Sequence, residues 1–157
     1  MSDDAARPFD DGAQWPADND TPGPAEPPAA DLERQLHELA ERETAYGLLQ
    51  RGKQLLTRRH HAQAAVLLER ASRLEPGKGS IIEALARAYY NSGQHTRAVD
   101  AFRELLRIDP SAAYGHFGLG QSLKQVGLRD EARTHLRLAC ALTPDSRLYR
   151  QALSRLR

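Results

Sequence analysis

Apolar side chains recur at helical spacing through most of the chain. The first clear case is Leu32, Leu36 and Leu39, which lie three and four residues apart and therefore share one face of a helix. Asp31 is a suitable N-cap for this helix, and no proline follows it before residue 76. We expect helix from residue 31 to about residue 57, either as one rod or as two helices that break near residues 43 and 44. The three leucines would also suit self-association of the chain.

Three prolines in phase divide the rest of the helical pattern. They stand 34 residues apart, and they are the only prolines after residue 30. A fixed period of this length indicates one supersecondary unit that has been copied and stacked. With Pro76, Pro110 and Pro144 at position 32 of each unit, the units are residues 45–78, 79–112 and 113–146.

Aligned in this way, the units place side chains of similar size at the same positions. Two antiparallel helices pack closely when a small residue on one faces a large residue on the other, so each unit should be a helix pair. Glycine within a helix costs about 1 kcal/mol relative to alanine, and Gly52 and Gly120 therefore indicate close contact between helices. Positions 8 and 20 hold the small residues Gly52, Ala86, Gly120, Ala64, Ala98 and Ala132, and positions 11 and 24 hold the large residues Leu55, Tyr89, Leu123, Leu68, Phe102 and Leu136.

Turn signals separate the two helices of each unit. Gly93 and Gly127 occupy one repeat position and suit the left-handed turn that ends a helix, whereas the first unit has Arg59 there. At the start of the second unit, Ser80 and Glu83 match the S-x-x-E capping box, which predicts that Ser80 caps the next helix.

The chain should end in a capping helix over residues 147–157. A stacked array exposes a hydrophobic face at its last unit, so a terminal helix with a polar outer side is required there. Asp145 is a candidate N-cap for this helix. Its apolar face would consist of Tyr149, Ala152, Leu153 and Leu156.

These motifs resemble those of the tetratricopeptide repeat (TPR) family, from Ala45 to Ser146. The resemblance rests on Gly or Ala at position 8, Ala at position 20 and Pro at position 32 of all three units. It implies an all-α fold: a right-handed superhelical array of three antiparallel helix pairs, with a helical extension at residues 31–44 before it and the capping helix after it. The chain departs from the family at position 4, where tryptophan is common and where Leu48, Ile82 and His116 stand.

The resemblance also implies a function. In this family the first helices of the pairs line a concave groove that holds peptides, so we expect a non-enzymatic protein–protein interaction module that serves as a scaffold or adaptor. Aromatic and basic residues at the groove positions suit a partner with acidic and with aromatic or aliphatic side chains. The expected groove residues are Tyr46, Leu49, Lys53, Arg87, Tyr90, Asn91, Tyr114, Phe117, Gln121 and Lys124.

One known activity of the family is not expected in this chain. Members that bind chaperones hold a terminal carboxylate with lysine, asparagine and arginine side chains at defined positions. The matching positions here do not conform, because they hold Leu49, Lys53, Ala84, Tyr114 and Gly118.

The net charge of +1 conceals two oppositely charged parts. Residues 1–30, here called the acidic leader, hold seven acids, one arginine and six of the nine prolines, which gives −6 and leaves +7 for the rest. Such a segment cannot bury enough apolar surface to fold, so we expect it to be disordered. We also hypothesise that its Phe9 or Trp15 docks on the groove. The basic remainder leaves nucleic-acid binding open as an alternative function, through Arg133, Arg137, Arg147 and Arg150.

The sequence shows no signature of an enzyme. Cys140 is the single cysteine, which excludes an internal disulfide and is compatible with a reducing cytoplasm. We find no run of eighteen apolar residues and no secretory signal. The six histidines lack the spacing of metal ligands, and no serine or cysteine has an evident base beside it. We therefore expect a cytoplasmic protein without catalytic residues, metal or cofactor.

Overall fold

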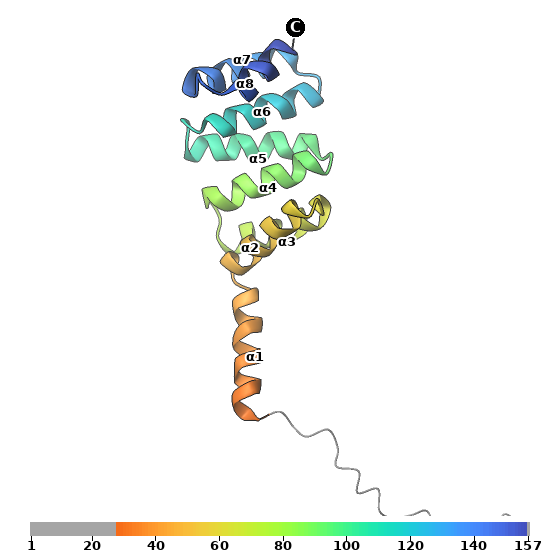
Figure 1. Ribbon diagram of the computed structural model, residues 1–157, viewed down its shortest axis with the longest axis vertical. Helices are drawn as coiled ribbons and strands as arrows, with labels where there is room; N and C mark the ends of the chain where they lie inside the picture. The colour runs from red at the N-terminus through yellow and green to blue at the C-terminus, as the bar shows by residue number, and fades with distance from the viewer. Residues whose placement is uncertain (1–27, 157) are drawn as a thin grey trace, which may run out of the picture.

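The computed structural model describes residues 28–156, which form eight helices and no strand (Figure 1). The predicted all-α fold is thus confirmed over these residues. The first 27 residues lie outside the described part, so the disorder of the acidic leader stays a prediction. The helices are α1 (Ala29–Arg42), α2 (Ala45–Thr57), α3 (His61–Leu74), α4 (Gly79–Asn91), α5 (His95–Ile108), α6 (Ala113–Gln125), α7 (Arg129–Leu142) and α8 (Arg147–Ser154).

Helices α2 to α7 form three antiparallel pairs. The first helices begin at residues 45, 79 and 113 and the second helices at 61, 95 and 129, so both series keep the 34-residue spacing of the prolines. Each pair packs on the next, with α3 against α4 and α5 against α6, and α8 packs on α7. Figure 1 shows the pairs stacked along the long axis of the molecule, with α7 and α8 at the end opposite α1.

The region before the first pair is two helices rather than one rod. Thr44 caps α2, because its Oγ1 accepts a hydrogen bond from the backbone N–H of Gly47 at 3.0 Å. The other end of α1 differs from the prediction: α1 begins at Ala29, so Asp31 lies within the first turn and its predicted role as N-cap is wrong.

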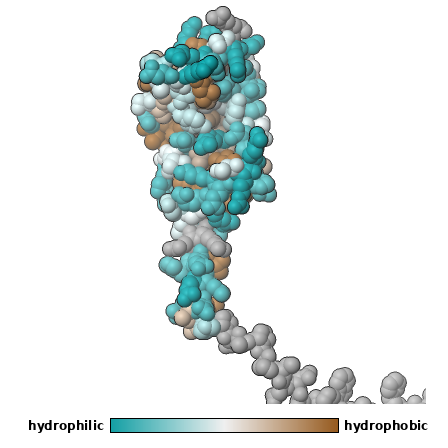
Figure 2. Space-filling model, in the orientation of Figure 1, coloured by the Kyte–Doolittle hydropathy of each residue, from teal (hydrophilic) through white to brown (hydrophobic). Residues whose placement is uncertain are grey.

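Helix α1 extends away from the array (Figure 1). Its three leucines are largely exposed, at 48% for Leu32, 57% for Leu36 and 55% for Leu39. In Figure 2 the hydrophobic colour on α1 lies along one side, beside hydrophilic residues. None of the helices in the described part of the chain is long and apolar enough to cross a membrane.

Small residues allow the paired helices to approach closely, as the repeat alignment predicted. A Cβ atom added at Gly52 would lie 2.7 Å from Leu68 Cγ, and one added at Gly120 would lie 2.8 Å from Leu136 Cγ. Both leucines are fully buried. The predicted close contact at these two glycines is therefore confirmed, since any larger residue there would push the paired helices apart.

The turns within the three pairs have the same conformation. Arg59, Gly93 and Gly127 have φ angles of 64°, 81° and 90°. In each turn a backbone N–H bonds a carbonyl five residues earlier, at 2.8 Å from His60 to Leu55 and at similar lengths in the other two turns. The first turn thus keeps the left-handed geometry without glycine.

Two further predicted caps are wrong. Lys78 is the N-cap of α4, and its side chain makes no capping hydrogen bond, so Ser80 lies inside the helix and does not form a capping box with Glu83. At α8 the N-cap is Ser146 rather than Asp145, because the Ser146 hydroxyl accepts a hydrogen bond from the backbone N–H of Tyr149 at 3.3 Å.

Candidate functional site

A small cavity lies where α4 and α6 face each other across the ring of Phe102 from α5. Its volume is about 80 Å³. We call it the α4–α6 cavity. Six of the ten expected groove residues line it, together with Phe102 and Gly118: Arg87, Tyr90, Asn91, Tyr114, Phe117 and Gln121.

Helical spacing explains why these side chains converge. On α4 the cavity residues are Arg87, Tyr90 and Asn91, three and four residues apart. On α6 they begin at Tyr114 and end at Gln121, at intervals of three and four residues. Residues at these intervals share one face of a helix, and because the pairs stack, the two faces lie opposite each other.

Aromatic contacts fix the walls of the cavity. The ring of Tyr114 lies edge-on to Phe102, with centroids 6.2 Å apart, and 6.4 Å from the ring of Phe117. Phe117 in turn stacks on Tyr149 of α8 at 4.8 Å. Such ring pairs stabilise each other by roughly 0.5–1.5 kcal/mol beyond their buried area, which favours the arrangement of the rings seen here.

Two residues of the cavity were not among the expected groove residues. Phe102 is buried and lines the cavity, and a Cβ atom at Gly118 would overlap its ring. Glycine at 118 is therefore needed for the close approach of α6 to Phe102. The sequence did contain a hint of this role. Gly118 does not lie at positions 8 and 20, where small residues allow the two helices of one pair to pack, so its small size serves a contact with another pair.

The polar groups at the cavity are available to a ligand. Burial raises the pKa of Tyr114 to about 12, with Arg87 lowering it and Glu83 raising it to a smaller extent. The hydroxyl of Tyr114 is therefore protonated at neutral pH and can donate a hydrogen bond. Arg87 is exposed and makes no hydrogen bond or ion pair within the described residues. A ligand would thus meet an apolar cavity with the cation of Arg87 and the hydroxyl donor of Tyr114 beside it, and with the carboxylate of Glu83 near that hydroxyl.

The other four expected groove residues are not part of this cavity. Tyr46 is 66% exposed and lines a wide hollow of about 690 Å³ at the junction of α1 and α2. Leu49 is only 4% exposed and belongs to the hydrophobic core, so it offers a ligand little surface. Lys53 is exposed on α2, and Lys124 is half-buried on α6.

The described residues contain no group of three or more histidine, cysteine, aspartate or glutamate side chains that could hold a metal ion. Two histidines, His116 of α6 and His135 of α7, lie against each other. The Nδ1 atoms of His116 and His135 lie 3.0 Å apart, and Nε2 of His116 lies 2.9 Å from the carbonyl oxygen of Pro110. One ring nitrogen of the pair is thus already used by the backbone.

Comparisons with known proteins agree with this architecture. The family model for the tetratricopeptide repeat matches residues 49–113 and 83–147. Among solved structures, the first TPR of Spaghetti (RPAP3) bound to the HSP90 peptide SRMEEVD matches with a TM-score of 0.68 and 14% identity, covering 72% of this chain and 90% of that chain. The Sgt2 TPR domain from Aspergillus fumigatus matches with a TM-score of 0.66 and 19% identity, covering 71% and 76%. The OM64 TPR domain from Arabidopsis matches with a TM-score of 0.69 and 18% identity, covering 72% and 93%. A search of curated proteins found no match.

Proposed function

Because the chain belongs to the tetratricopeptide repeat family, we propose that it is a non-enzymatic protein–protein interaction module, a scaffold or adaptor, that binds a peptide segment at the α4–α6 cavity. Domains of this family are protein–protein interaction modules, and one structural neighbour is bound to an HSP90 peptide. The observation that carries the proposal is the cavity itself, which combines aromatic walls with the cation of Arg87, which has no ion pair within the described part of the chain.

The size of the cavity indicates what enters it. Pockets for small molecules and cofactors have volumes of roughly 300–1,000 Å³, whereas this cavity has about 80 Å³. It therefore suits one aliphatic side chain or one aromatic ring that projects from a longer peptide. Apolar anchors of this kind supply much of the affinity at interfaces.

The charge beside the cavity indicates the neighbour of that anchor. Arg87 can pair with a carboxylate in bidentate geometry, and the Tyr114 hydroxyl can donate to a peptide carbonyl. Asn91 and Gln121 also line the cavity and can bond main-chain amides. The proposed ligand is therefore a peptide in which a leucine or phenylalanine stands next to aspartate or glutamate.

Fluorescence anisotropy with labelled peptides tests this proposal. One peptide carries leucine followed by two aspartates, and its partner replaces both aspartates by lysines. We expect the acidic peptide to bind more tightly, and we expect Arg87→Glu to weaken it about tenfold, which is about 1.4 kcal/mol. Tyr114→Ala combined with Phe117→Ala should weaken both peptides, with little loss of helical circular dichroism.

The matched control is Arg107→Glu, which changes the net charge equally at an exposed position of α5. It should leave binding of the acidic peptide within twofold of the unmodified chain. Equal losses in Arg87→Glu and Arg107→Glu would mean that only net charge matters, and the cavity would not be the binding site.

A further inference from the structure

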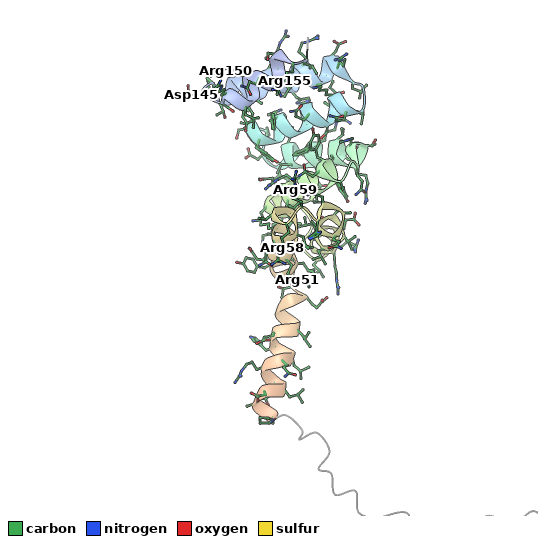
Figure 3. All side chains as sticks on the ribbon, turned by 45° about the vertical axis from the view of Figure 1, so that its right-hand side comes forward. Arg51, Arg58, Arg59, Asp145, Arg150 and Arg155 are labelled. Atoms are coloured by element: carbon green, nitrogen blue, oxygen red, sulfur yellow. The ribbon has the colours of Figure 1, made fainter. Side chains whose placement is uncertain are left out.

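A basic hollow lies at the C-terminal end of the array, between α7 and α8. Its volume is about 350 Å³, and three arginines line it together with Leu153 and Ser154 and the single cysteine, Cys140. None of the described residues that line it is acidic. Figure 3 shows one of the three arginines, Arg150, on α8 at this end of the molecule. We call the hollow the arginine basin, and its arginines are Arg133, Arg137 and Arg150.

The three guanidinium groups differ in the partners that they have within the protein. Arg133 donates to Oδ1 of Asp130 at 3.2 Å and to the carbonyl oxygen of Leu156 at 3.4 Å. Arg150 donates to a neutral acceptor, the carbonyl oxygen of Pro144, at 3.0 Å. Arg137 makes no hydrogen bond or ion pair within the described residues. Arg137 and Arg150 thus line one hollow without an ion pair to a carboxylate of the described residues, and like charges repel unless an anion lies between them.

The chain itself carries an anion of suitable chemistry. All seven acids of the acidic leader lie within its first 27 residues, beside one arginine. Two of the acids, Asp10 and Asp11, are adjacent in sequence, and Asp18 and Asp20 are close to each other. Carboxylates and guanidinium groups form short, charge-assisted and often bidentate hydrogen bonds. The basin and the acidic leader are therefore complementary in charge.

Within one copy of the chain, helix α1 lies between the acidic leader and the array that carries the arginine basin. With 14 residues, α1 is about 21 Å long, and it leads away from the end that carries α7 and α8 (Figure 1). Three stacked helix pairs add about 30 Å at a helix spacing of 8–10 Å. Pro28 is therefore about 50 Å from the basin by these helix dimensions.

Several acids of the leader cannot reach the arginine basin of their own copy, even through a fully extended chain. Fully extended, the ten residues from Asp18 to Pro28 span at most about 33–36 Å. Asp20 and Glu26 reach less far, and Asp10 would reach its own basin only through a nearly straight chain. A second copy can place its acidic leader on the basin without any such extension.

We propose that the arginine basin binds the acidic leader of a second copy, so that copies join head to tail. Each contact uses one leader and one basin and leaves the other leader and the other basin free, so the assembly is heterologous and open to growth. The basin lies on α7 and α8, apart from the α4–α6 cavity. The proposal is therefore independent of the proposed peptide binding.

Sedimentation velocity of the full chain over a range of concentrations tests the association. We expect oligomers that increase with concentration and dissociate at high salt, because the Debye length shrinks to about 3 Å at 1 M ionic strength. Arg137→Glu should weaken the association about tenfold, or about 1.4 kcal/mol, without affecting the fold, since Arg137 makes no hydrogen bond or ion pair with any residue from 28 to 156. Arg73→Glu makes the same charge change at an exposed position of α3 and should associate like the unmodified chain.

A mixing experiment separates contact between copies from contact within one copy. The double variant Asp10→Lys, Asp11→Lys keeps its basin, and Arg137→Glu keeps its acidic leader. Each should stay largely monomeric alone, whereas an equal mixture should form dimers that grow no further. In the unmodified chain, rising concentration should also slow the reaction of Cys140 with a thiol reagent, because Cys140 lines the basin.

Three results would overturn the proposal. The first is a mixture that remains monomeric, and the second is equal weakening by Arg73→Glu and Arg137→Glu. The third is a full chain that stays monomeric at every concentration while Arg137→Glu weakens binding of a single-stranded oligonucleotide, which would assign the basin to nucleic acid. Docking of the leader on its own groove would instead give a Trp15 emission that is independent of concentration and sensitive to Tyr114→Ala.

Discussion

Arg59 holds a left-handed backbone conformation, with a φ of 64°, at the turn position where the other two pairs have glycine. A residue with a Cβ atom is strained there by roughly 1–2 kcal/mol, whereas glycine is not. Glycine also has more conformational freedom to lose on folding, which offsets part of this gain. We expect Arg59→Gly to stabilise the protein by about 0.5–1 kcal/mol, measured as the free energy of unfolding in urea.

Arg59→Ala is the matched control, because alanine loses the same side chain but keeps the strain. It should leave stability nearly unchanged, and Gly127→Ala should lower it by about 1 kcal/mol. If Arg59→Ala stabilised the protein as much as Arg59→Gly, the arginine side chain rather than the backbone would be responsible. Arg58 directly precedes Arg59 in sequence, and Figure 3 labels both, so repulsion between these two arginines is the specific alternative.

Gly120 tests the packing within the third pair. A Cβ atom there would already lie 2.8 Å from Leu136 Cγ and 3.1 Å from the backbone oxygen of Ala132. Gly120→Leu should therefore overpack the contact of α6 with α7, which typically costs about 1–3 kcal/mol. Gln125→Leu, at an exposed position of the same helix, should cost far less. Thermal unfolding by circular dichroism compares them, and similar melting temperatures would contradict this account of the packing.

At the scale of residues, the contacts that the sequence could predict are those that recur in every repeat. The close contacts at Gly52 and Gly120 were predicted correctly because each unit has a small residue at that position. Gly118 was not assigned to the cavity, because its role depends on the ring of Phe102 on another helix. Leu49 was expected in the groove from its repeat position. Its aliphatic side chain packs into the core instead, whereas Phe117 at the same position of the third unit is only half-buried.

At the scale of elements, the pair of His116 and His135 makes the stability of the contact between α6 and α7 depend on pH. The Pro110 carbonyl can only accept, so Nε2 of His116 carries a proton and its Nδ1 accepts from Nδ1–H of His135. Burial lowers the pKa of His135, and the neighbouring His116 lowers it further. The unfolded chain therefore binds a proton more readily than the folded one. The resulting stability is present above about pH 6.5 and is lost as the pH falls through the lower pKa of the folded state.

Replacing the titrating group tests this linkage. His135→Gln keeps an N–H donor toward His116 and removes the titration, so the melting temperature should fall less between pH 7 and pH 5 than in the unmodified chain. His60→Gln, at an exposed position, should leave the pH dependence as it is. Identical pH profiles for the unmodified chain and His135→Gln would show that the pair does not govern acid stability.

Helix ends were harder to predict than the helices themselves. The 34-residue period locates six helices because their apolar faces must all be buried in the same way. Caps depend on the few residues around each end: the backbone turns at Gly77, with a φ of 76°, and α4 already begins at Gly79. The motif at Ser80 and Glu83 thus falls inside the helix. The bend at Thr44 left two possibilities in sequence, since nothing local forbids a continuous rod.

At the scale of the whole molecule, stability should depend on distance along the stack. Among the described helices, the main contacts between pairs join neighbouring pairs, and such arrays behave as a chain of coupled units whose ends open first. The direction of α1 relative to the array is also a property of the whole molecule. No repeated contact in the sequence specifies it, so the sequence could not predict that α1 extends away from the array.

Two core substitutions of similar cost should therefore act over different distances. Phe102→Ala in the middle pair typically costs about 3–5 kcal/mol, and Leu156→Ala beside the capping helix about 2–5 kcal/mol; both side chains are 1% exposed. Measured by hydrogen exchange, Leu156→Ala should increase exchange in α7 and α8 and leave α2 and α3 protected. Phe102→Ala should increase exchange from α3 to α6. Phe102 belongs to the middle pair, which contacts the first pair through α4 and α3 and the third pair through α5 and α6.

Loss of protection across all helices in both variants would mean that the array unfolds as one cooperative unit. In that case the end of the stack could not open independently, and the capping helix would support the whole array rather than its last pair.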